Sequence, residues 1–383
     1  MSVTAARGFT AAGVAAGIKG NGNRDLAVVV NEGPRCAAAG VFTSNRVQAA
    51  PVRWSRQVLA GGEVRAVVLN SGGANACTGA QGLRDTRATA ERAAGLLGLA
   101  SGEVAVCSTG LIGVPLPMDR LLAGVDSAVA GLSAAGGEDA ALAVMTTDTV
   151  PKTAAVTRDG WTVGGMAKGA GMLAPGLATM LVVLTTDADL DGGVLDKALR
   201  DATRVTFDRI DSDGCMSTND TVLLLASGAS GIAPEHEEFT EALHAVCAGL
   251  ARQLIGDAEG ASKEIRIEVV GAASEEDAVE VGRSIARNNL LKCAVHGEDP
   301  NWGRVLSAIG TTGAVFEPDR LGVAINGVWV CRDGGVGEDR ALVDMTGREV
   351  HIVADLAAGA GSATIWTNDL TADYVHENSE YSS

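Results

Sequence analysis

Short apolar runs alternate with helical spacings along this chain of 383 residues. Runs rich in apolar and β-branched residues predict strands at 26–30, 64–69, 103–107, 180–184 and 221–226. Apolar residues that recur every three or four positions predict helices at 83–97, 117–130, 189–201 and 237–255. Strands that alternate with helices in this way are typical of an α/β fold.

The two ends of the chain carry more strand than helix. Residues 1–80 read as strands and turns, and residues 321–370 read as several short strands with turns between them. Residues 265–269 alternate as a half-buried strand does, and Ser274 is placed to cap a helix that runs to about residue 289. No repeat, low-complexity linker or block of charge divides the chain.

The candidate catalytic residues lie where a glycine-rich loop leads into the apolar run at 180–184. The loop begins at Lys168, contains Pro175 and ends at Ala178, so that Thr179 takes the first position of a core strand. A threonine hydroxyl is a nucleophile only when a base removes its proton, and a free α-amine on the same residue is such a base. Two interpretations stay open from the residues alone: an ordinary β-forming threonine, or a nucleophile exposed when the chain cuts itself before Thr179.

The stretch Lys168-Gly-Ala-Gly-Met172, with Pro175 and Ala178-Thr179-Met180-Leu181 behind it, resembles the self-cleavage signature of the ornithine acetyltransferases. Further similar stretches cover nearly the whole chain: Asn70 to Gly79, Ser108-Thr109-Gly110, Met145-Thr-Thr-Asp-Thr149, Gly256 to Lys263 and His296 to Arg304. In the segment 256–263, Ala258 and Ser262 depart from the family's residues, whereas Glu259 is kept.

The resemblance implies a fold, a cut and an activity. The fold is α/β, with β-layers sandwiched by helices (αββα, of the self-processing N-terminal-threonine nucleophile type) and a smaller second domain. Cleavage between Ala178 and Thr179 gives an alpha chain, 1–178, and a beta chain, 179–383, which stay together as an α2β2 assembly. The activity is ping-pong transfer of acetyl from N-acetyl-L-ornithine to L-glutamate in arginine biosynthesis.

The resemblance also assigns site residues, each of which has a plainer reading. Thr109 and Gly110 form the oxyanion hole, although a small-residue turn after a strand is usually only a turn. Thr146, Lys168, Asn378 and Ser383 hold the carboxylate and amide parts of the substrate, although the 145–149 segment could instead cap a helix and Lys168 could be solvated. Glu259 receives the positively charged end of ornithine, although a loop glutamate is commonly exposed. His296 receives no chemical role.

The composition of the chain argues against several kinds of partner and of metal site. The net charge of −17 argues against nucleic-acid or anionic-membrane partners. Seven scattered cysteines without a C-x-x-C pair indicate a reducing compartment and no zinc site, and no secretory signal or membrane span is read, so a cytoplasmic location is expected. The aspartates of 208–220 lack the calcium-loop pattern, which fails at Cys215. No metal or prosthetic group is expected. Many family members also accept acetyl-CoA, and this chain shows no separate CoA motif.

Two rival functions remain at this stage. A self-processing amidase or aminopeptidase would use the same nucleophile and pass the acyl group to water. A small-ligand-binding protein would never cut itself. Self-cleavage would distinguish an acetyltransferase from the binding protein. Transfer of the acetyl group to glutamate, instead of its release as acetate, would distinguish it from the amidase.

Overall fold

The computed structural model describes residues 2–174 and 180–380. The chain divides into two compact units, each of which is described by itself. Within the described residues, unit 1 comprises 2–174, 180–208 and 215–257, and unit 2 comprises 209–214 and 258–380. The expected smaller second domain is therefore present, as unit 2.

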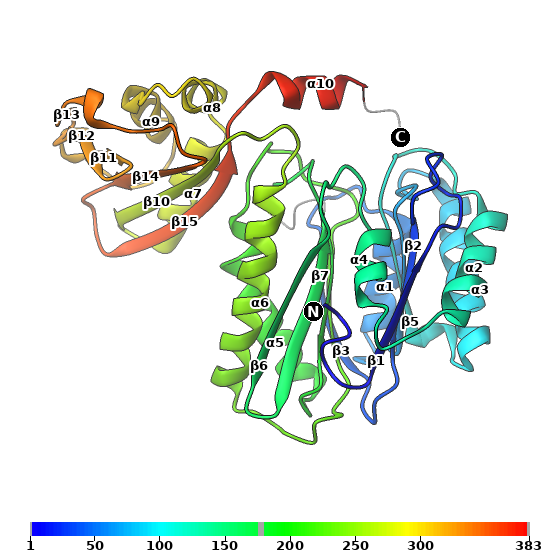
Figure 1. The fold of residues 1–383 in the computed structure, drawn as a ribbon. Coiled ribbons are helices and arrows are strands. Elements are labelled where there is room, and N and C mark those ends of the chain that lie inside the picture. The colour runs from blue at the N-terminus through cyan, green and yellow to red at the C-terminus, as the bar shows by residue number, and fades with distance from the viewer. Residues whose placement is uncertain (1, 175–179, 381–383) are drawn as a thin grey trace. The chain divides into compact units, whose positions relative to one another are not determined.

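Unit 1 contains two β-sheets (Figure 1). The first has the order β1-β2-β4-β5, from the strands β1 (Phe9–Val14), β2 (Leu26–Asn31), β4 (Ala66–Asn70) and β5 (Val104–Ser108). The second has the order β3-β9-β8-β7-β6, from β3 (Ala37–Phe42), β9 (Thr221–Ala226), β8 (Leu181–Thr186), β7 (Trp161–Lys168) and β6 (Lys152–Arg158). Neighbouring strands are antiparallel except for the parallel pairs β4–β5 and β8–β9.

The two sheets of unit 1 pack face to face over one apolar core. The first sheet contributes Phe9, Ala11, Ala27, Val29, Val67, Leu69, Ala105 and Cys107, and the second contributes Ala38, Met166, Leu181, Val183, Leu223 and Leu225. Alternate residues of each strand point to this core, as the two-residue period of a strand requires. The helices α1 (Ala50–Leu59) and α4 (Gly137–Ala143) add Val58, Ala140 and Ala141 to it.

Helices cover the outer face of each sheet (Figure 1). On the first sheet, α2 (Gly79–Leu97) and α3 (Met118–Ala130) share a second apolar cluster with Leu26, Val28 and Val68. On the second sheet lie α5 (Gly192–Arg204) and α6 (His236–Gly256), and the Phe239 ring lies 5.8 Å from the Trp161 ring of β7, centroid to centroid. The layers are therefore helix, sheet, sheet, helix, which confirms the αββα prediction.

Unit 2 has one sheet of order β13-β12-β11-β14-β10-β15. Its strands are β10 (Glu264–Ala272), β11 (Gly322–Ile325), β12 (Val328–Arg332), β13 (Gly335–Val336), β14 (Glu349–Asp355) and β15 (Gly361–Asn368). Its helices are α7 (Glu275–Ala286), α8 (Asn289–His296), α9 (Trp302–Ile309) and α10 (Ala372–Glu380). The sheet and the helices α7 to α9 bury a separate apolar cluster, so that unit 2 has a core of its own.

Most sequence-predicted elements are confirmed, and three differ. Residues 1–80 contain the helix α1 beside their strands, because Pro51 lies in the first turn, where the missing N–H costs nothing. The helix predicted at 189–201 begins at Gly192, because Asp191 is still extended. The helix that Ser274 caps, through the Asp277 N–H, ends at Ala286, and Asn288 caps a separate helix, α8.

The layering predicts where shortening an apolar side chain lowers the stability of the fold most. Leu223 of β9 is 1% exposed and lies between the two sheets. We expect Leu223→Ala to lower the free energy of unfolding by about 2–5 kcal/mol, because it leaves a cavity that the two sheets cannot close. Leu96→Ala on α2, where the side chain is 42% exposed, is the control with the same chemistry. Urea unfolding of both variants makes the comparison, and equal losses would contradict it.

Candidate active site

The ends of β4 and β5 hold two loops against each other. Because these strands are parallel, the loops that follow them meet at the same edge of the sheet. The Gly73 N–H donates to the Thr109 carbonyl at 3.0 Å, and the Ser108 hydroxyl donates to the Asn70 side-chain oxygen at 2.6 Å. The glycine-rich loop after β4 therefore fixes the turn Ser108-Thr109-Gly110.

That turn offers two hydrogen-bond donors of different kinds. The Thr109 N–H donates to the Asn70 carbonyl at 2.9 Å, so it is unavailable to a substrate oxygen. The Gly110 N–H has no acceptor among the described residues. Gly110 has a φ of +129°, and a Cβ there would lie 2.6 Å from the Gly73 nitrogen, so only glycine fits. The donors left at the turn are the Gly110 N–H and the Thr109 hydroxyl.

Lys168, the last residue of β7, lies beside that hydroxyl. Its ammonium group donates to Thr109 Oγ1 at 3.0 Å, and the residue is only 2% exposed. A solvated surface lysine is therefore excluded. An oxygen that accepts from a buried cation becomes a stronger hydrogen-bond donor through its own proton. Lys168 thus increases the ability of the Thr109 hydroxyl to stabilise a negative oxygen.

Asp148 connects Lys168 to the 145–149 segment. Its carboxylate accepts the Thr146 N–H at 2.9 Å, the Gly169 N–H at 2.7 Å and the Lys152 ammonium at 2.6 Å. Burial opposes the charge of this carboxylate, but Lys168 and Lys152 outweigh it and hold the pKa of Asp148 below its usual value. Sequence reasoning placed Thr146 at the site and missed Asp148, although the spacing of Asp148 and Lys152 could have suggested the pair.

The segment before β9 reaches the same region from the second sheet. The Asn219 amide donates to the Ala74 carbonyl at 2.6 Å and to the Ser108 carbonyl at 2.8 Å. Asp220 accepts the Met180 N–H at 3.2 Å, just before β8 begins. Burial raises the pKa of the Asp220 carboxyl well above its usual value. Neither residue was singled out from the sequence, because their partners lie far away along the chain.

Two predicted substrate contacts come together within unit 2. The Asn378 amide on α10 donates to Glu259 Oε2 at 2.9 Å, so the structure pairs residues that are 119 positions apart. His296 lies 3.0 Å from Asp369 Oδ2 and 3.2 Å from Ser262 Oγ through its Nδ1 atom. This small polar network fits the structural interpretation of His296.

Three predicted site residues, Ala178, Thr179 and Ser383, lie outside the described residues. Thr109, Gly110, Thr146 and Lys168 belong to unit 1, and Glu259 and Asn378 belong to unit 2. No cluster of three metal-ligating side chains occurs in the described part of the chain. No helix in that part is long and apolar enough to cross a membrane.

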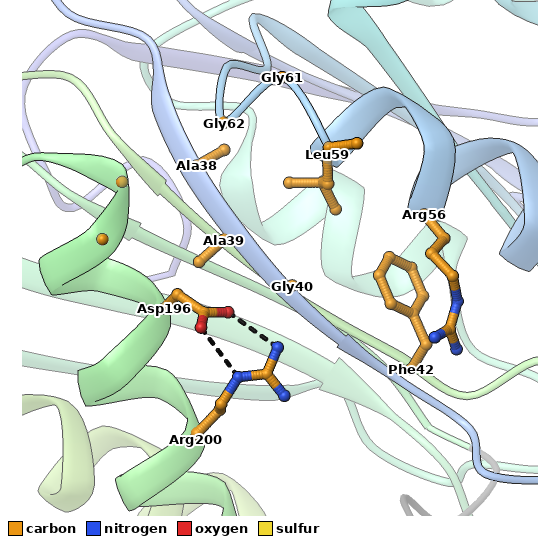
Figure 2. Close-up of a pocket in the computed structure, with 13 residues that line it drawn as sticks. Ala38, Ala39, Gly40, Phe42, Arg56, Leu59, Gly61, Gly62, Asp196 and Arg200 are labelled. Atoms are coloured by element: carbon orange, nitrogen blue, oxygen red, sulfur yellow. Dashed lines mark hydrogen bonds and ion pairs between the residues drawn. The ribbon is translucent and has the colours of Figure 1, made fainter.

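A separate pocket of about 400 Å³ lies in unit 1 between α1 and α5, over β3 (Figure 2). The Arg56 guanidinium lies 5.1 Å from the centroid of the Phe42 ring, and Arg200 pairs with Asp196. None of the predicted site residues lines this pocket. It therefore takes no part in the site described above.

The αββα layering and the buried polar cluster at Lys168 define an α/β enzyme with the N-terminal-nucleophile type of fold. The sequence profile of the ArgJ family matches residues 10–383, so the chain belongs to the ArgJ family. It is accordingly an acetyltransferase of arginine biosynthesis.

Two named relatives and two solved structures are similar to this chain. The arginine biosynthesis bifunctional protein ArgJ of Streptomyces avermitilis is 79% identical over 383 residues, and that of Thermobifida fusca is 65% identical, each over the full length of both chains. A solved ArgJ chain from Bacillus halodurans is 36% identical with a TM-score of 0.50, and covers 52% of this chain and 98% of its own. An ornithine acetyltransferase from Mycobacterium tuberculosis, solved with ornithine, is 60% identical with a TM-score of 0.45, and covers 47% and 96%.

The Thr109 hydroxyl gives a direct test of the oxyanion donors. We expect Thr109→Val to lower kcat for acetyl transfer by about 10²–10³-fold, the usual effect of removing one such donor. Thr109→Ser keeps the hydroxyl and should stay within about tenfold of the wild type, or about 1.4 kcal/mol. Steady-state kinetics of both variants decide the matter. Equal rates for the two would show that the hydroxyl plays no part.

The Asp148 carboxylate gives a test of the cluster that supports Lys168. We expect Asp148→Asn to lower the free energy of unfolding by about 3–5 kcal/mol at pH 7, because two buried ammonium groups lose a shared counter-charge. Since the folded-state pKa is lowered, this stabilisation is complete above about pH 4 and declines as the pH falls further. Urea unfolding from pH 7 to pH 3 measures it. Asp126→Asn, at an exposed pair with Arg92, is the control and should leave stability nearly unchanged.

Proposed function

We propose that this acetyltransferase moves the acetyl group of N-acetyl-L-ornithine to L-glutamate through an acetyl ester on Thr179. The observation that carries the proposal is the Thr109–Gly110 turn, with one uncommitted N–H and one hydroxyl bonded to a buried ammonium group. Donors of this kind stabilise the oxyanion of acyl transfer. The full-length similarity to bifunctional ArgJ proteins supports the same substrates.

The proposed enzyme first makes its own nucleophile. The Thr179 hydroxyl attacks the Ala178 carbonyl carbon, the peptide C–N bond breaks in an N-to-O acyl shift, and water hydrolyses the resulting ester. The products are the chains 1–178 and 179–383, which remain associated as α2β2. In support, a solved relative's chain is matched over nearly all its length by about half of this one.

Acetyl transfer then follows in two half-reactions. The α-amine of Thr179 takes the hydroxyl proton as Oγ attacks the acetyl carbonyl, and the developing oxyanion is held by the Thr109 hydroxyl and the Gly110 N–H. The tetrahedral intermediate collapses, the proton passes to the leaving nitrogen and L-ornithine departs. The amine of L-glutamate attacks the acetyl ester in turn, which yields N-acetylglutamate and restores the free hydroxyl.

We assign substrate recognition to the residues that the family resemblance names. Lys168, Thr146, Asn378 and Ser383 hold the carboxylate and amide portions, and Glu259 receives the ammonium end of ornithine. The hydrogen bond between Glu259 and Asn378 supports a shared role for these two. The reaction needs no metal or prosthetic group, and acetyl-CoA is a second acetyl donor to test. We place the reaction in the cytoplasm.

Intact mass under denaturing conditions tests self-cleavage. We expect two fragments that part between Ala178 and Thr179 from the wild type, and one whole chain from Thr179→Ala, which lacks the attacking hydroxyl. The purified wild type is then given N-acetylornithine and glutamate. N-acetylglutamate is the expected product, whereas release of free acetate would indicate the amidase. A wild-type chain that stays whole would remove the α-amine base, and the proposed mechanism with it.

A further inference from the structure

Asn219 and Asp220 make hydrogen bonds next to the proposed oxyanion turn and next to the proposed nucleophile. It immediately precedes β9 in the second sheet of unit 1. Asn219 donates to the carbonyl groups of Ala74, in the loop after β4, and of Ser108, the last residue of β5 in the first sheet. Asp220 accepts the N–H of Met180, at the start of the strand that follows Thr179. Two consecutive side chains thus link the oxyanion turn to the nucleophile strand.

Asp220 is more than a buried capping group. The residue is fully buried, and its Oδ2 atom has no hydrogen-bond partner among the described residues. Burial raises its pKa well above the usual value, against the opposing effects of the Met180 N–H, Lys168 and nearby hydroxyls. A buried polar atom without a partner destabilises the folded state. The hydrogen bond from the Met180 N–H is therefore the contact that ties this buried carboxyl to the strand after Thr179.

The hydrogen bond to Met180 acts on Thr179 through covalent geometry. A peptide unit is planar, and the N–H of one residue shares that plane with the carbonyl and Cα of the residue before it. A carboxyl oxygen that holds the Met180 N–H therefore restrains the peptide unit to which Thr179 contributes its carbonyl group. Asn219 holds the carbonyl of Ser108, whose peptide unit carries the Thr109 N–H.

We propose that Asn219 and Asp220 are a pair of positioning residues that sets the placement of the Thr179 nucleophile relative to the Thr109–Gly110 oxyanion turn. This inference rests on the proposed function of Thr179. The pair acts in self-cleavage and in acetyl transfer alike, because both reactions bring the same hydroxyl to a carbonyl carbon. A shift of 1 Å between reacting groups can cost about 10²-fold in rate.

The test compares Asp220→Ala with Asp220→Asn. Asn keeps an oxygen for the Met180 N–H and Ala keeps none. We expect Asp220→Ala to slow both self-cleavage and kcat by about 10²-fold, with KM for N-acetylornithine within about threefold of the wild type. Asp220→Asn should recover most of both rates. The readouts are a time course of intact mass and steady-state kinetics on the cleaved enzyme.

Asp187→Asn is the matched control. Asp187 follows the other end of β8, is 1% exposed, and accepts the backbone N–H groups of Thr162 and Arg7 at 2.7 and 3.1 Å. It should lower the midpoint of thermal unfolding without slowing the reactions of the folded protein. If the Asp220 variants lower the midpoint of thermal unfolding but their folded protein keeps the wild-type rates, as is expected of this control, their role is structural and the proposal is overturned.

Asn219→Ala examines the other half of the pair and serves also if Asp220→Ala does not fold. It frees the carbonyls of Ala74 and Ser108, and we expect kcat to fall at least about tenfold with little change in KM. Wild-type rates in Asn219→Ala, with no folded Asp220→Ala, would overturn the proposal. A wild-type chain that neither cuts itself nor transfers acetyl would overturn the proposed function and this inference together. An active wild type with an equally active Asp220→Ala would overturn the inference alone.

Discussion

A buried ammonium group is the constraint around which unit 1 is organised. Lys168 is almost fully removed from water at the end of β7, and an isolated charge there would be strongly unfavourable. Two groups offset the cost of burying this charge. The Thr109 hydroxyl accepts a hydrogen bond from the ammonium group, and the Asp148 carboxylate supplies a negative charge that Lys168 in turn stabilises. Asp148 in turn binds the backbone of Thr146 and Gly169. One cation therefore fixes three separate segments of chain.

Strand direction brings these segments to one end of the sandwich. The parallel pair β4–β5 ends at Asn70 and Ser108, so their following loops are neighbours. In the second sheet, β7 ends at Lys168 opposite the start of the antiparallel β8, and β8 starts beside the start of the parallel β9. Lys168, Met180 and Asp220 consequently lie at the same edge of one sheet. Sheet topology, more than any loop, brings the polar groups together.

The sequence predicted what depends on local periodicity. The strand at 221–226 is confirmed, because a strand buried on both faces leaves a short continuous apolar run. The face of α6 that carries Phe239 and Leu250 is confirmed, because burial on one side of a helix leaves a regular spacing. The Thr109–Gly110 turn was singled out by resemblance, but not the fact that Asn70 occupies the Thr109 N–H. The contacts of Asp148 and Asp220 depend on the packing of distant strands and on loss of water, which no local pattern records.

The strand order of the second sheet has a consequence for the two polypeptides that a cut before Thr179 would leave. The strands β9 and β8, from the later polypeptide, lie between β3 on one side and β7 with β6 on the other, all from the earlier one. The pieces are interleaved within a single hydrogen-bonded ladder, so neither can leave without breaking it. A cut at that position would leave the fold intact, because the hydrogen bonds between β3 and β9 and between β7 and β8 hold the two polypeptides together. After such a cut, each polypeptide would still supply strands that the other needs to complete the sheet.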